Sequence, residues 1–333
     1  MIVFKNIIYT LFLLTLIISC NKEQPHLLEN ESADLCPEMY EVNSSLISDT
    51  VVKGDYTPNQ PSQPNYFYTS DYYYFDLAVN PNNPFEFVFK RCEVINQQPS
   101  FEDCKLYKFN FCNSNLNFID DVDYSCTIDW GSNNWIIYTS NFDVYKIRPN
   151  ASDKTQIINS ANGIHALHWS PNETKILASI DVNAVKIFNQ NGDLLETLSF
   201  NYNSICWKNN TEAFYSYNGA IYVYDIENLE STLYLTDNFP GANDLMTKSD
   251  KLLFSSNQGI YEIDTSNNNA LLIDSNHTTY FGRHPKSLEN DKMLLSRKII
   301  DTNEFFINNV NTRSYLTFFD KQTSEERIIN IPE

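Results

Sequence analysis

The sequence predicts an all-β protein built from a repeated four-stranded unit, and three observations support this fold class. Short apolar runs alternate with polar turns along most of the chain, and helical periodicity is nearly absent. Aromatic residues make up 14% of the chain, with 21 Tyr and 22 Phe, and such side chains suit half-buried pleated surfaces. The third observation is a pattern that recurs about every 40 residues.

The pattern is clearest in residues 164–188, IHALHWSPNETKILASIDVNAVKIF. An alternating segment ends in Trp169-Ser170-Pro171, and a polar turn follows it. An apolar run at 176–179, a second polar turn and another apolar run at 184–188 complete the unit. This order predicts three short strands of one antiparallel meander.

Weaker copies of the unit lie on both sides of this stretch. The first strand of each copy ends at Val79, Trp130, Trp169, Trp207, Thr247 and His284. The spacings between these positions are 51, 39, 38, 40 and 37 residues, and a cysteine-bearing insertion near 92–104 lengthens the first. A third run follows in each copy, and a weaker fourth run often follows that one, as in 194–200, 233–236 and 327–331.

A period of this length with four strands per repeat indicates a β-propeller, because sheets stacked radially cover one another's faces. Six copies predict a six-bladed propeller over residues 66–333, or a seven-bladed one if residues 40–68 add a blade. Trp130, Trp169 and Trp207 are expected to be the large side chains wedged between adjacent blades.

The segment HWSPNETKILAS resembles the WD-repeat-like units of TolB-type propellers, in which W-S-P-D-G-x-x-I-A-F-like motifs recur in every blade. The resemblance is good at Trp169-Ser170-Pro171 and at Ile176-Leu177-Ala178, and it extends over roughly residues 70–331. The chain departs from it at Asn172-Glu173, where Asp-Gly is usual. The motif specifies a fold more than a function, but TolB-like propellers act as envelope binding partners.

Residues 1–19 are predicted to be a lipoprotein signal peptide. Lys5 gives a short positive start, residues 7–18 are almost wholly apolar, and Ser19 directly precedes Cys20. This ending resembles the lipobox of bacterial lipoproteins, which implies cleavage before Cys20 and a diacylglycerol thioether on its sulfur. The alternative is an ordinary signal peptide with an incidental cysteine. Residues 20–65 are expected to be the lipidated Cys and a tether, with three prolines in 57–64.

The sequence next to the lipidated Cys bears on cellular address. Lys22-Glu23 lies where sorting signals act in bacterial lipoproteins, and the absence of Asp there implies the outer membrane of a cell envelope. A membrane partner is therefore expected through the lipid anchor, with periplasmic or surface orientation left open.

Seven cysteines fit an exported protein. The six besides Cys20 are Cys36, Cys92, Cys104, Cys112, Cys126 and Cys206. The pairs Cys92–Cys104 and Cys112–Cys126 are the hypothesised disulfides, because each pair flanks one short predicted segment. Cys206, inside an apolar strand, is expected to be a buried thiol.

Charge and motifs exclude several classes of function. The formal net charge of −19 repels phosphate backbones, so nucleic acid is not expected as a partner. No nucleophile elbow, phosphate-binding loop or H-E-x-x-H helix occurs. His165 and His168 would point to opposite faces of a strand. No catalytic, cofactor-binding or metal-binding residues are therefore predicted.

The densest acidic group is Asp120-Asp121-Val122-Asp123. Carboxylates on a loop are ligands that calcium prefers, but this group lacks the full pattern and the Gly of an EF-hand. A solvated acidic loop is the favoured interpretation, and calcium is the single cofactor hypothesis that the sequence leaves.

Two classes of function stay open at this point. The favoured one is a non-catalytic module that binds a protein or a glycan. The alternative is a propeller enzyme, a hydrolase or lyase, with a carboxylate or His site in the central funnel. The sequence does not identify the ligand or the oligomeric state.

Overall fold

The computed structural model describes residues 40–41, 65–68, 71–96, 98–110, 113–160, 162–180, 184–236, 239–275, 280–288, 293–303, 309–324, 326–329 and 331–332. The chain divides into two units, Met1–Pro37 and Glu38–Glu333, and all of these residues belong to the second. They form strands and turns. The predicted signal peptide, most of the predicted tether, and Cys20, Cys36 and Cys112 lie outside the described residues.

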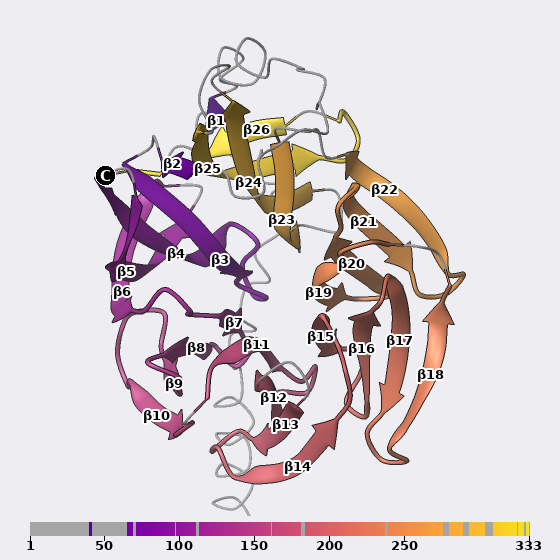
Figure 1. Cartoon of the computed structure of the whole chain (residues 1–333). Helices are drawn as coiled ribbons and strands as arrows, with labels where there is room; N and C mark the ends of the chain where they lie inside the picture. Colours follow the sequence, from indigo (N-terminus) through magenta and orange to yellow (C-terminus); the bar gives the residue numbers. More distant parts are fainter. Residues whose placement is uncertain are drawn as a thin grey trace, which may run out of the picture. The chain divides into compact units, whose positions relative to one another are not determined.

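Five four-stranded antiparallel sheets follow one another along the chain, and each is a propeller blade (Figure 1). Blade 1 comprises β3 (Tyr72–Val79), β4 (Glu86–Ile95), β5 (Gln98–Asn110) and β6 (Asn115–Val122). Blade 2 comprises β7 (Ile128–Trp130), β8 (Ile136–Ser140), β9 (Asp143–Ile147) and β10 (Thr155–Ile158). Blade 3 comprises β11 (Ile164–Trp169), β12 (Lys175–Ile180), β13 (Ala184–Asn189) and β14 (Leu194–Ser199). Blade 4 comprises β15 (Ser204–Trp207), β16 (Glu212–Tyr217), β17 (Ala220–Asp225) and β18 (Glu230–Leu235), and blade 5 comprises β19 (Asn243–Lys248), β20 (Lys251–Ser255), β21 (Gly259–Asp264) and β22 (Asn269–Ser275).

The last part of the chain forms a sheet of a different make-up. Its strands are β23 (Tyr280–Leu288), β24 (Met293–Asn303), β25 (Asn309–Asp320) and β26 (Glu326–Ile329). Two strands from the start of the unit join them: β1 (Tyr40–Glu41) pairs with β26, and β2 (Asn65–Tyr68) pairs in parallel with β25. The sheet therefore has six strands.

The all-β propeller is confirmed, but the predicted count of six blades, or seven, is wrong. The residues that the structure describes form five four-stranded blades. The copy expected to be the sixth blade has strands of up to 12 residues and lies in the six-stranded sheet. The segment expected to supply a seventh blade instead contributes β1 and β2 to that same sheet, since their backbone groups find partners on its existing strands.

The first strands of successive sheets lie around the centre of the ring (Figure 1). Each of β3, β7, β11, β15, β19 and β23 contacts the next, and β23 contacts β3. The second strands are the most buried, and every residue of β8 is buried. The fourth strands are the most exposed, as the first four residues of both β14 and β18 show.

The apolar core lies between blades rather than within them. Trp130 packs with Val88 and Leu106 of blade 1, and Trp169 packs with Ile137 and Val144 of blade 2. These tryptophans are 3% and 7% exposed, so both are buried against the preceding blade. This is the wedge position that the sequence predicts.

Trp207 repeats the arrangement at the interface of blades 3 and 4. It packs with Leu177 and Val185 of blade 3 and is 2% exposed. Its indole Nε1 donates a hydrogen bond of 3.1 Å to the backbone carbonyl of His168. The side chain thus joins two blades by both packing and a directional bond.

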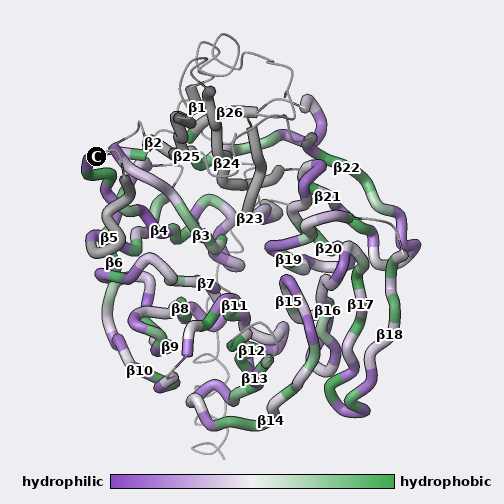
Figure 2. The backbone as a smooth tube through the Cα atoms, in the orientation of Figure 1, coloured by the Kyte–Doolittle hydropathy of each residue, from purple (hydrophilic) through white to green (hydrophobic). Residues whose placement is uncertain are grey.

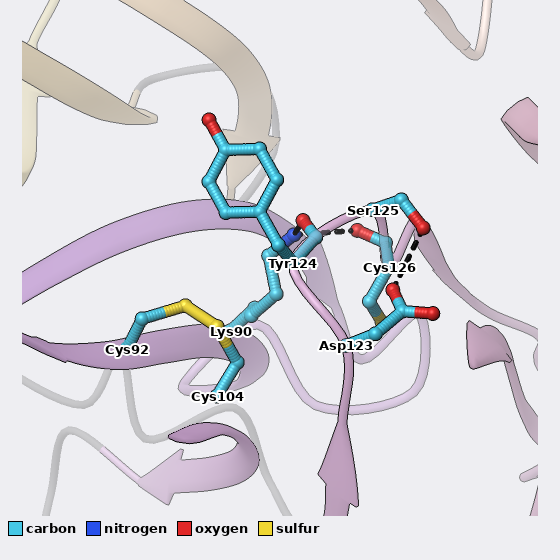
Figure 3. Close-up of a disulfide and its surroundings, with 7 residues drawn as sticks. All are labelled: Lys90, Cys92, Cys104, Asp123, Tyr124, Ser125 and Cys126. Carbon is cyan, nitrogen blue, oxygen red and sulfur yellow. Dashed lines mark hydrogen bonds between the residues drawn. A yellow bond between two sulfur atoms is a disulfide. The ribbon is translucent and has the colours of Figure 1, made fainter. Parts of the chain in front are cut away.

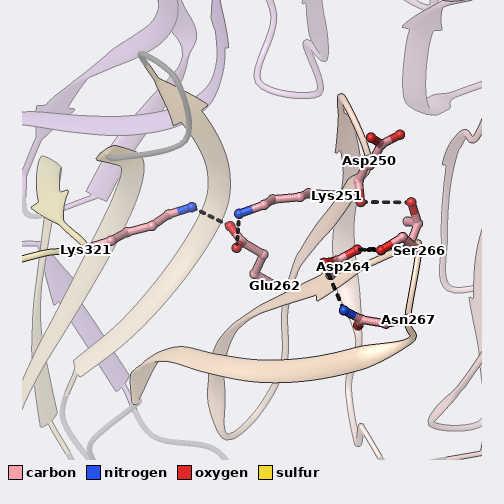
Figure 4. Close-up of polar contacts among 8 residues, drawn as sticks. Asp250, Lys251, Glu262, Asp264, Ser266, Asn267 and Lys321 are labelled. Atoms are coloured by element: carbon pink, nitrogen blue, oxygen red, sulfur yellow. Dashed lines mark hydrogen bonds and ion pairs between the residues drawn. The ribbon is translucent and has the colours of Figure 1, made fainter.

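An ion-pair group joins blade 5 to the six-stranded sheet (Figure 4). Glu262 of β21 is buried and pairs with Lys251 of β20 at 2.6 Å. Its other oxygen pairs with Lys321, which follows β25. Because Glu262 and Lys321 are both largely buried, removing one partner would leave an uncompensated charge.

Arg91 of β4 joins the end of the chain to blade 1. Its guanidinium lies 4.1 Å from the ring centre of Tyr72 and 4.4 Å from that of Tyr107. Its Nη1 donates a 3.0 Å hydrogen bond to the carbonyl of Pro332. A planar cation suits this arrangement because it can stack on aromatic faces and donate from its edge.

Trp207→Ala should lower the free energy of unfolding by about 3–5 kcal/mol, because it opens a cavity between blades 3 and 4. Trp207→Phe keeps most of the packing and removes the indole N–H, so it should cost markedly less. Urea unfolding followed by circular dichroism measures both. A loss below about 1 kcal/mol for Trp207→Ala would contradict the wedge role.

Candidate functional site

The polar side chains of the inner strands form contacts from one blade to the next. Asp76 of β3 accepts hydrogen bonds at Oδ2 from Thr127 Oγ1 (3.0 Å) and from the backbone N–H of Ile128 (2.9 Å). Asp129 of β7 accepts a 2.7 Å bond at Oδ2 from the backbone N–H of Trp169. Each carboxylate therefore satisfies a backbone donor of the next inner strand.

The same linkage continues around the ring with hydroxyl groups. Ser204 of β15 accepts a 3.0 Å bond from the backbone N–H of Leu245 of β19. Thr247, at the position where a Trp stands in three other blades, donates a 2.7 Å bond to the carbonyl of Trp207. The hydroxyl of Thr247 thus joins blade 5 to blade 4, as the indole N–H of Trp207 joins blade 4 to blade 3.

His168 of β11 is the inner-strand histidine whose pKa is shifted by its surroundings. Burial lowers its pKa, because the charged imidazolium is disfavoured away from water. The carboxylates of Asp129 and Asp76 oppose this effect, whereas the ammonium group of Lys286 on β23 lowers the pKa further. We call Asp76, Asp129, His168 and Lys286 the inner-strand group.

The inner-strand group is the best candidate for chemistry in the part of the chain that the structure describes. A neutral imidazole that feels the charge of nearby carboxylates can accept a proton, as a general base must. Two of its members, Asp76 and Asp129, already bind the neighbouring blade. Among the described residues, no three His, Cys, Asp or Glu side chains gather closely enough to hold a metal ion.

Sequence reasoning missed this group, although one signal was present. Asp129 and His168 each stand directly before a wedge tryptophan, so they occupy the same place in consecutive repeats. His165, which the sequence placed on the opposite face of the same strand and not in any site, is exposed. The remaining histidines, His26, His277 and His284, lie where no side chain is described.

The turns after the first strands are also joined in series. Asn82 Nδ2 donates to the carbonyl of Ser132 at 2.7 Å, which links blades 1 and 2. Glu173 accepts bonds from the backbone N–H groups of Ser132 and Asn133, the latter at 2.8 Å, which links blades 2 and 3. Glu173 has a φ of 58°, the left-handed region that glycine favours. This conformation explains why the TolB-type motif usually has Gly at this position. In this chain the hydrogen bonds to the Glu173 carboxylate help to hold a non-glycine residue there.

The interpretation of the acidic group as a solvated loop is wrong, because Asp120, Asp121 and Val122 belong to strand β6. Two of its carboxylates make contacts within the protein. Asp120 accepts a hydrogen bond from the Tyr138 hydroxyl and pairs with Lys154 at 2.5 Å. Asp123 accepts bonds from Ser125 Oγ (2.7 Å) and from the backbone N–H of Asn141. These bonds assign both carboxylates a structural role at the junction of blades 1 and 2.

One of the two hypothesised disulfides is present. Cys92 and Cys104 are bonded across β4 and β5, with 4.0 Å between their Cα atoms (Figure 3). The second pairing is not formed, because Cys126 carries a free, buried thiol. Its hypothesised partner, Cys112, lies outside the described residues. Cys206 is also free and buried, as predicted.

The surroundings of Cys126 explain why its thiol lies in the core. The ammonium group of Lys90 donates to the carbonyls of Tyr124 and Cys126, the latter at 3.0 Å (Figure 3). It also lies 4.6 Å from the ring centre of Phe75. These contacts fix the segment so that Cys126 packs in the core between blades 1 and 2. Burial raises the pKa of the Cys126 thiol to about 12, which keeps it protonated and unreactive.

Comparison with known proteins gives a fold and no family. No family model matches the chain, and no curated protein matches it. A solved structure titled "The structure of putative TolB from Agrobacterium tumefaciens" is similar at a TM-score of 0.51 and 12% identity, covering 67% of this chain and 86% of that one. The C-terminal WD40 domain of Sif2 has a TM-score of 0.49 and 10% identity, covering 80% of this chain and 98% of that domain. At such identity, the likeness to the TolB structure shows the propeller fold alone.

His168→Gln should reduce the loss of stability on acidification. The unfolded chain takes up a proton on this histidine below about pH 6.5, whereas the folded chain resists it, so the residue opposes folding increasingly as the pH falls from about 6.5. Well above that pH it exerts no such effect. Urea unfolding at a series of pH values measures the change.

His165→Gln is the matched control, because His165 is exposed on the same strand. Equal flattening of the pH dependence by both substitutions would contradict the lowered pKa of His168.

Proposed function

We propose that this protein is a lipid-anchored lipoprotein of the cell envelope, placed at the outer membrane, whose propeller is a non-catalytic module that binds a protein or a glycan. The fold of the described residues is consistent with a binding module. The propeller provides a rigid platform, and loops carried by a rigid scaffold are a common place for recognition.

One observation carries the proposal. The polar side chains of the inner strands are used to bind one blade to the next, as Asp76, Asp129 and Ser204 show. A catalytic group must keep its reactive atom available for a substrate. Side chains that satisfy backbone donors instead stabilise the ring as a scaffold.

The alternative is a propeller enzyme with a carboxylate and His site at the centre. The perturbed pKa of His168, close to Asp129 and Lys286, favours it, because such perturbation is frequent at active sites. His168→Gln separates the two functions. A binding module should retain its partner in this variant, whereas an enzyme that uses this imidazole should lose turnover.

The membrane part of the proposal depends on the sequence around Cys20. Among the residues that the structure describes, no helix is long and apolar enough to cross a membrane. A thioether-linked diacylglycerol and an acylated amino terminus would together anchor the chain stably, since two or more acyl chains are needed.

Cys20→Ser should abolish incorporation of labelled palmitate and move the protein from the membrane fraction to the soluble envelope fraction. Lipid is attached to the sulfur of this residue in the proposal, so a hydroxyl cannot replace it. Cys36→Ser is the matched control and should keep both the label and the membrane location. A Cys20→Ser protein that remains labelled would refute the anchor.

A further inference from the structure

The outer strands of blades 4 and 5 are sheet edges that carry exposed leucines. β18 and β22 come last in their sheets, so one edge of each has no paired strand among the described residues. Leu233 on β18 is 53% exposed, and Leu272 on β22 is 41% exposed. Both strands include hydrophobic stretches, which are green in Figure 2. Such edges tend to pair with other chains, and proteins usually protect them with charged residues, proline or a covering segment.

Each of these leucines ends an apolar row that crosses its blade. Leu233 lies opposite Tyr222 of β17, which stacks on Tyr215 of β16 with 5.0 Å between ring centres. In blade 5, Leu272 lies opposite Tyr261 of β21, which stacks on Phe254. A further strand added beside β18 or β22 would continue the row.

The outer strand of blade 2 shows that this arrangement is not a general property of blades. β10 exposes Thr155 and Gln156 at its start, and Lys154 precedes it. A polar edge with a nearby lysine is the protected kind of edge. The edges of β18 and β22 therefore differ from that of β10 in chemistry as well as in exposure.

The charge around β18 has one sign. Residues 209–247 contain six Asp or Glu residues and no Lys, Arg or His. Glu227 and Glu230 are exposed beside the strand, and Asp225 lies opposite Glu230. Hydrogen bonds from Asn228 lower the pKa of Asp225, so this carboxyl is ionised at neutral pH. A basic segment complements such a surface.

We propose that the outer edge of β18 binds an extended, basic segment of a protein partner by strand addition, and that β22 offers a second edge with an exposed leucine. In an added strand, successive side chains point to opposite faces. Apolar side chains would lie beside Leu233, and Lys or Arg would lie on the other face beside Glu230. The inference rests on the proposed binding function and specifies its partner as a protein.

The test uses the full chain in detergent and a fluorescent peptide of alternating Val and Lys, with binding followed by anisotropy. Wild type should bind this peptide, and it should not bind the peptides of alternating Val and Glu or Ser and Lys. Methylation of alternate backbone nitrogens should abolish binding, because strand addition needs those donors.

Three variants test the named residues. The double variant Leu233→Gln/Leu272→Gln and the variant Glu230→Gln should each weaken binding about fivefold or more, since each loses an apolar or a charged contact. Phe142→Gln is the matched control, because Phe142 is 49% exposed but lies between β8 and β9, away from any outer edge. All proteins are prepared in the same detergent, so peptide uptake by micelles cancels in the comparison.

The inference is overturned if wild type does not bind the Val–Lys peptide, or if the double variant and Glu230→Gln bind it as wild type does. Leucine-dependent binding of the Cys20→Ser chain to phosphatidylcholine vesicles would also overturn it, in favour of a membrane contact. Crosslinking in intact envelopes separates the two levels of proposal. A partner captured equally by wild type and the double variant refutes the edge alone, whereas capture of no partner by wild type refutes the proposed function.

Discussion

Contact between neighbouring blades is the constraint on which the rest of this structure depends. A four-stranded sheet has two faces, and one sheet alone cannot bury either of them. Here the core clusters span adjacent blades, as Trp207 with Leu177 and Val185 shows. The stability of every blade therefore includes contributions from its neighbours. The same requirement applies where the first and last strands of the ring meet, and there β1 and β2 pair with β26 and β25.

The inter-blade contact has two components that reinforce each other. Apolar side chains such as Trp169 supply area, while polar groups such as Asp129 satisfy backbone donors that packing would otherwise leave unpaired in the interior. The bond from Thr247 to the carbonyl of Trp207 shows that the polar component persists where the large side chain is missing. A blade with a weak motif can thus keep its place in the ring.

The sequence predicted the repeating unit because burial imposes a strict pattern on the second strands and on the wedge tryptophans. It predicted the Cys92–Cys104 bond because both residues flank one hairpin. The predicted number of blades was wrong because strand pairing, rather than burial, determines the make-up of the six-stranded sheet. β1 and β2 are short, and their partners β26 and β25 lie far along the chain. Such long-range pairing leaves no local signal.

The candidate site was hidden for a related reason. The chain contains 42 Asp and Glu residues, so the sequence alone does not distinguish Asp76 and Asp129 from the others. Only the structure shows that they accept hydrogen bonds from the next inner strand. His168 was noticed, but its spacing from His165 argued against a pair, and the groups that perturb it come from other sheets.

The ring geometry also separates structure from recognition. Radial stacking buries the inner and middle strands, so their side chains are committed to the fold. The blades present their fourth strands at the outside, where contact with a neighbour is least and backbone groups along one edge are available. Substitutions at Leu233 or Glu230 therefore need not disturb the core, whereas those at Trp207 or Asp129 must. The sequence of these outer strands can therefore vary without destabilising the fold, so a propeller can acquire specificity for a partner there.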